Sequence, residues 1–105
     1  MSDIVLIYIT VPSEEKSQEI TRSLLEKHLI ACATMWPCKS MYWWDGAIQN
    51  DQEFIILAKT TENKVELLKQ AVASLHPYTI PCILKIAATA NTPYAQWVSN
   101  EVETI

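Results

Sequence analysis

The chain has 105 residues, half of them hydrophobic, with four Trp, a single Gly and a formal net charge of −4. This length allows one domain, residues 1–105, and not two. The negative charge argues against a nucleic-acid partner, because phosphates are neutralised by a basic face. A small monomer cannot easily hide so much apolar surface from water, so the composition favours self-association.

The three cysteines, Cys32, Cys38 and Cys82, are odd in number and form no Cys-x-x-Cys pair. This usage is typical of free thiols in a reducing compartment. The apolar run "IVLIYITV" near the N-terminus follows an Asp rather than a basic segment. It is also much shorter than the about 20 residues that a membrane-spanning helix needs. We therefore expect a cytoplasmic protein without a membrane partner.

The first predicted element is a strand over residues 3–11, which are β-branched and aliphatic and end at Pro12. Ser13 then has the character of a helix N-cap. The helix is predicted to continue to about residue 30, with an apolar face made of Ile20, Leu24, Leu25 and Leu29.

A long hairpin follows, with Asp45-Gly46 as a predicted type I′ turn. Pro37 predicts a bulge or kink over residues 36–38 at a sheet edge. The return arm alternates between two faces, with Glu53, Ile55, Leu57 and Lys59 on one and Phe54, Ile56 and Ala58 on the other.

Thr61 is predicted to cap a second helix, which Pro77 ends. Its apolar stripe is Val65, Leu68, Val72 and Leu75. Residues 82–89 form the fourth predicted strand, and a short C-terminal helix follows Pro93, with an aromatic face that includes Tyr94 and Trp97.

The element order is β-α-β-β-α-β plus a terminal helix, which is the ferredoxin-like α+β arrangement. Right-handed crossovers place all four strands in one antiparallel sheet with both long helices on the same face. The other face and the hairpin edges then lack cover, and pairing with further copies of the chain supplies it.

The sequence combines several motifs: Ala31-Cys32, Ser40-x-Tyr42-x-Trp44-x-Gly46, Lys59-Thr60 and His76-Pro77-Tyr78, followed by Tyr94 and Trp97. Together they closely resemble the CutA family of divalent-cation tolerance proteins. The resemblance extends from "TVPSEE" to Trp97. It implies a homotrimer of ferredoxin-like subunits, similar in architecture to PII signalling proteins. It also implies a role in tolerance of copper and other divalent ions, without a required cofactor.

The resemblance points to His76 and Cys82 as the candidate metal ligands. Copper-binding relatives use a Cys at the end of the first strand, His residues at the end of the second helix and an acidic residue after "HPYxxP". This sequence has Ile9, Leu75 and Cys82 at three of those positions and keeps only His76. A thiolate at Cys82 suits Cu(I) or Zn²⁺. One His and one Cys are too few for a closed site, so we expect weak binding of copper or another divalent cation.

His76 also has a structural interpretation, in which its ring caps the last carbonyls of the second helix and packs beneath Tyr78. His28, late in the first helix, has no second ligand nearby in sequence and suits a surface or helix-end role.

The aromatic residues suggest a ligand cleft between subunits, lined by Tyr42, Trp44, Lys59, Tyr78 and Trp97. Lys59 would then bind a small anionic ligand, as in a PII-like sensor. Dense aromatics equally suit subunit contacts, and a purely structural trimeric scaffold is a further alternative. The sequence contains no paired acidic motif, glycine-rich phosphate loop or Ser-x-x-Lys, so we do not predict an enzyme.

Overall fold

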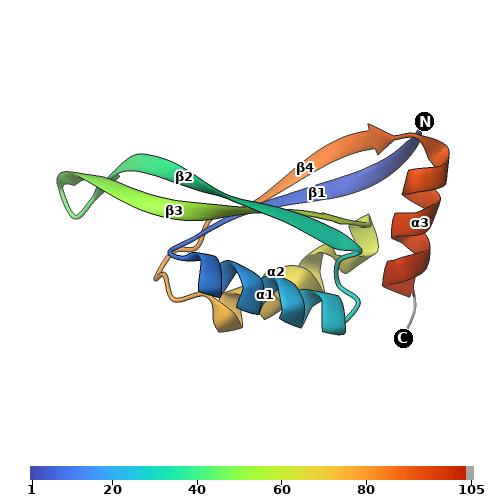
Figure 1. The fold of residues 1–105 in the computed structure, drawn as a ribbon, viewed down its shortest axis with the longest axis horizontal. Coiled ribbons are helices and arrows are strands. Elements are labelled where there is room, and N and C mark those ends of the chain that lie inside the picture. The colour runs from blue at the N-terminus through green and yellow to red at the C-terminus, as the bar shows by residue number, and fades with distance from the viewer. Residues whose placement is uncertain (104–105) are drawn as a thin grey trace.

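The computed structural model describes residues 1–103 and forms a four-stranded antiparallel sheet beneath which two helices lie (Figure 1). The strand order is β2-β3-β1-β4. The strands are β1 (Ser2–Val11), β2 (Cys32–Trp44), β3 (Ala47–Thr60) and β4 (Ile83–Ala90). The helices are α1 (Glu14–Glu26), α2 (Val65–Leu75) and α3 (Thr92–Glu103), and a 3₁₀ turn, η1 (Glu62–Lys64), precedes α2. The predicted ferredoxin-like fold is confirmed.

The core lies between the sheet and the helix pair. Strand β1 runs through its centre, and its alternate residues Ile7, Ile9 and Val11 are fully buried against the helices. Ile20 of α1 and Leu68 of α2 meet them from the other side. Because strand side chains alternate, the intervening residues of β1 point to the opposite face of the sheet, which neither α1 nor α2 covers.

Helix α1 begins where the sequence predicts and ends earlier. The Ser13 hydroxyl accepts a hydrogen bond from the backbone N–H of Lys16 at 3.1 Å, so the predicted N-cap is confirmed. The helix stops at Glu26 rather than near residue 30, because His28 adopts a left-handed conformation with φ of 55°. The His28 ring then donates from Nδ1 to the carbonyl of Glu101, 3.0 Å away, and so connects this corner to α3.

The β2–β3 hairpin turns at Asp45 and Gly46, whose φ values of 52° and 76° are both positive, as a type I′ turn requires. Of the bulge or kink predicted at Pro37, the bulge is wrong. Pairing runs without an inserted residue from Trp36 opposite Ile55 to Cys38 opposite Glu53. Pro37 is tolerated because β2 is an edge strand, as predicted, so its missing N–H removes no bond to an outer neighbour.

The second helix differs from prediction only at its start. The Thr61 hydroxyl donates to the side chain of Asn63 at 2.5 Å and makes no capping bond, so the predicted cap is wrong. Helix α2 begins at Val65, after η1. Its apolar stripe does face the core, and it ends at Leu75, two residues before Pro77, as predicted.

The C-terminal helix α3 packs at the end of the sheet beside the N-terminus (Figure 1). Ala95 and Val98 are buried there against Ile4 of β1, and Tyr94 packs at the border of this small cluster. The Tyr94 hydroxyl lies 3.2 Å from the Cys32 thiol. The predicted docking of an aromatic face is only half right, because Trp97 remains 42% exposed.

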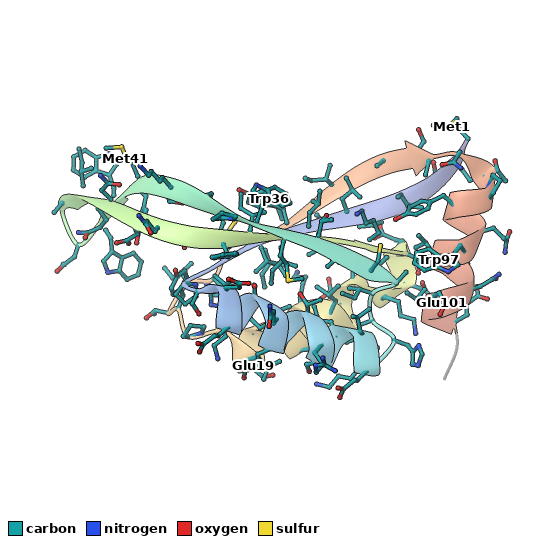
Figure 2. The ribbon with its side chains drawn as sticks, viewed as in Figure 1. Met1, Glu19, Trp36, Met41, Trp97 and Glu101 are labelled. Atoms are coloured by element: carbon teal, nitrogen blue, oxygen red, sulfur yellow. The ribbon has the colours of Figure 1, made fainter. Side chains whose placement is uncertain are left out.

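The face of the sheet opposite α1 and α2, here called the open face, carries large apolar side chains. Leu84 and Ile86 of β4 are 50% and 41% exposed. Figure 2 shows Trp36 on the side of the sheet away from Glu19 of α1. The hairpin extends beyond the helices and gives the molecule its 45 Å length. No helix within residues 1–103 is long and apolar enough to cross a membrane.

Substitution of two neighbouring leucines of α1 tests which residues belong to the core. Leu24 is fully buried, whereas Leu25, which the sequence placed on the same apolar face, is 39% exposed. We expect Leu24→Ala to lower the free energy of unfolding by about 2–5 kcal/mol, because it removes buried methyl groups and leaves a cavity. Leu25→Ala serves as the matched control and should have a much smaller effect. Urea unfolding of both variants measures the difference, and equal losses would contradict this core.

Candidate functional site

The open face contains a cleft of 660 Å³ between the hairpin and the loop that follows α2. Six of its lining residues carry an aromatic ring, a carboxylate or a thiol: Tyr8, Tyr42, Trp44, Glu53, Tyr78 and Cys82. We call this the aromatic cleft. Strand alternation produces it, because Tyr42 and Trp44 point to the same side of β2, the side that also faces Glu53 of β3.

Glu53 is the central polar group of the aromatic cleft. Glu53 is only 6% exposed, although its side chain is a carboxylate. The Tyr78 hydroxyl donates to its Oε2 at 2.6 Å, which meets the need of a buried carboxylate for a partner. Burial and this hydrogen bond raise the pKa of the Tyr78 phenol well above its usual range. The contact also ties the loop after α2 to β3.

His76 uses both of its ring nitrogens. Its Nε2 is 2.7 Å from the carbonyl oxygen of Thr10, and its Nδ1 is 3.2 Å from the backbone nitrogen of Tyr78. A carbonyl only accepts and a backbone N–H only donates, so this network assigns the neutral tautomer with the proton on Nε2. The ring bonds the end of β1 and not the last carbonyls of α2, which corrects the predicted cap. Its packing against Tyr78 is confirmed, with ring centroids 4.7 Å apart.

Cys82 lines the aromatic cleft and is partly buried. Burial, and then the nearby negative charge of Glu53, raise the pKa of its thiol. A raised pKa lowers the fraction of thiolate, which is the form that binds metal and attacks electrophiles. Ile9 and Leu75 both pack in the core on the other side of β1 and bring no ligand to the cleft. Residues 1–103 contain no group of three His, Cys, Asp or Glu side chains suited to a metal ion.

Two residues of the predicted cleft lie elsewhere in the chain. The Lys59 ammonium is 3.5 Å from the Thr34 hydroxyl, and neither residue lines the aromatic cleft. Trp97 belongs to α3, where its ring lies 5.7 Å from that of Tyr94. The structure therefore brings together Tyr42, Trp44, Tyr78 and Cys82 and leaves Lys59 and Trp97 out.

Sequence reasoning placed Glu53 on a face of β3 without assigning it a role, and it gave Tyr8 no role. The sequence did contain a signal for Glu53, because this acidic residue begins the otherwise apolar run "EFIILA". Ile55, which points to the same face of the strand as Glu53, is buried. Tyr8 is the one aromatic residue in the first apolar strand, and a phenol there provides a hydroxyl that an aliphatic residue would lack.

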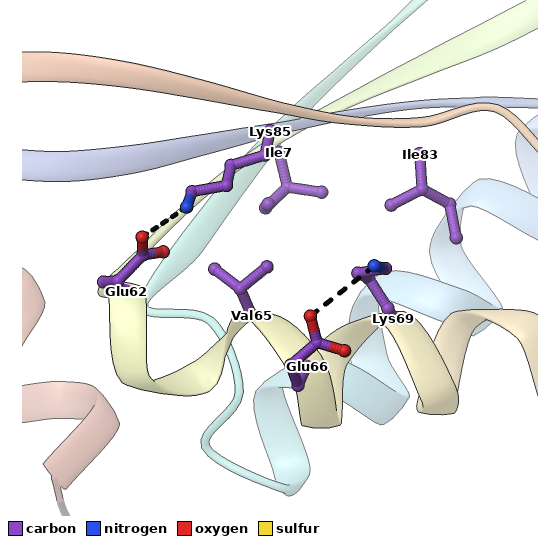
Figure 3. A pocket seen from close by; sticks show the side chains of 7 residues that line it. All are labelled: Ile7, Glu62, Val65, Glu66, Lys69, Ile83 and Lys85. Atoms are coloured by element: carbon purple, nitrogen blue, oxygen red, sulfur yellow. Dashed lines mark hydrogen bonds and ion pairs between the residues drawn. The ribbon is translucent and has the colours of Figure 1, made fainter.

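A second, smaller cavity of 280 Å³ lies between α2 and the helix side of the sheet (Figure 3). Its charged residues pair with each other. Lys85 bonds Glu62, and the Lys69 ammonium is 3.6 Å from the Glu66 carboxylate. Exposed pairs of this kind are common on protein surfaces and contribute little, so this cavity has no feature that singles it out as a site.

Residues 5–101 match the family model of the CutA1 divalent ion tolerance protein. The chain belongs to this family. A divalent-cation tolerance protein CutA of Thermotoga maritima is 42% identical over 100 residues, which cover 94% of this chain and 99% of the relative. A protein of the same name from Thermus thermophilus is also 42% identical, with 93% and 95% of the two chains covered.

Solved structures of CutA proteins share the fold closely. The periplasmic divalent cation tolerance protein CutA of Archaeoglobus fulgidus has a TM-score of 0.92 and 37% identity, covering 94% of this chain and 98% of that one. CutA of Synechococcus elongatus has a TM-score of 0.91 and 31% identity, covering 97% and 92%. Because the first of these relatives is described as periplasmic, the cytoplasmic location stays a prediction for this chain.

Alkylation of Cys82 tests the electrostatics of the aromatic cleft. Glu53 helps to raise the thiol pKa, so Glu53→Gln should lower that pKa, increase the thiolate fraction at pH 8 and speed alkylation by iodoacetamide. The measurement uses a Cys32→Ser, Cys38→Ser background, in which Cys82 is the single thiol. Glu66→Gln, on the helix side of the sheet, is the matched control and should leave the rate unchanged. A slower or equal rate in Glu53→Gln would contradict the assigned proximity.

Proposed function

We propose that this protein takes part in divalent-cation tolerance as a homotrimer without enzymatic activity, with the aromatic cleft close to a boundary between subunits. The observation that carries the proposal is the open face. It presents large apolar side chains over strands β2 and β4, both of which are edges of the sheet. Burying such a face against another copy removes apolar area from water and blocks the unpaired strand edges.

The hairpin supports the same assembly. Its outer part carries Met41, Trp43 and Ile48, of which Trp43 is 73% exposed. An isolated two-stranded ribbon is marginally stable by itself, and this one extends past the helices that cover the rest of the sheet (Figure 1). Contacts with a neighbouring subunit would hold it in place. The number of subunits, three, rests on the resemblance to CutA proteins.

For metal, we propose only low-affinity binding of copper or another divalent cation, at Cys82 with His76 as a second donor. Two features of the chain limit the affinity. The His76 Nδ1 lone pair accepts the Tyr78 N–H, so a metal would have to displace that hydrogen bond. The raised pKa of the Cys82 thiol also means that binding must first release a proton at neutral pH.

The anionic-ligand alternative depended on Lys59, which lies outside the aromatic cleft in the single chain. The residues lining the cleft include a buried carboxylate and no Lys or Arg. An anion would therefore lose its hydration without gaining a positive partner, so the geometry favours this alternative less than the trimeric tolerance protein.

Sedimentation of the reduced protein tests the assembly. We expect a single species of three chains of 11.9 kDa each at micromolar concentration. Leu84→Arg places a charge on the open face and should dissociate the assembly. Leu67→Arg is the matched control, because Leu67 is 56% exposed on α2, on the far side of the sheet, and it should leave the assembly intact. A folded wild-type chain that sediments alone would reject the trimer.

Calorimetric titration with Cu(I), Cu(II) and Zn²⁺ tests the metal proposal. We expect weak Cu(I) binding that Cys82→Ser abolishes, because a thiolate is the donor that Cu(I) prefers. Cys38→Ser, which changes a thiol that does not line the aromatic cleft, is the control and should retain the binding. Absence of binding up to millimolar ion would reject direct binding, and equal loss in both variants would reject Cys82 as the specific donor.

A further inference from the structure

We draw no further inference here: the strongest candidate, the 280 Å³ cavity between α2 and the helix side of the sheet, carries none, because its two ammonium groups, those of Lys69 and Lys85, already pair with Glu66 and Glu62 and no feature of residues 1–103 indicates what would occupy it.

Discussion

The constraint on which the rest of this structure depends is that α1 and α2 cover one face of the sheet, while α3 covers only one end of the other face. Strand β1 buries Ile7, Ile9 and Val11 completely beneath α1 and α2, and that face supplies most of the core. The strand period of two then sends the intervening residues, Leu6, Tyr8 and Thr10, to a face that the two long helices do not reach. The open face and the aromatic cleft both follow from this alternation.

Within the open face, the Glu53–Tyr78 hydrogen bond decides where a cleft forms. Tyr78 belongs to the loop between α2 and β4, and its bond to β3 holds that loop over the sheet. His76 fixes the other side of the same loop through Thr10 of β1. Because both bonds are made inside the protein, the loop is positioned by the fold and does not need a ligand to order it. The hairpin forms the opposite wall.

The family assignment and the chemistry of the cleft answer different questions. Membership of the CutA1 family associates this chain with divalent-ion tolerance. The cleft itself presents rings, a buried carboxylate and one thiol whose pKa is raised. This set is poor in metal donors, and residues 1–103 contain no group of three such side chains that could hold a metal ion.

The sequence by itself determined the element order, the N-cap at Ser13, the turn at Asp45-Gly46 and the apolar stripe of α2, because each depends on local propensity or on a short hydrophobic period. It could not determine where α1 ends, since the left-handed His28 is stabilised by a contact with α3, distant in sequence. Nor could it show that Tyr78 meets Glu53 while Lys59 and Trp97 lie apart from them. Those outcomes depend on strand register and loop path, which bring residues from separate elements together, and only the tertiary structure decided them.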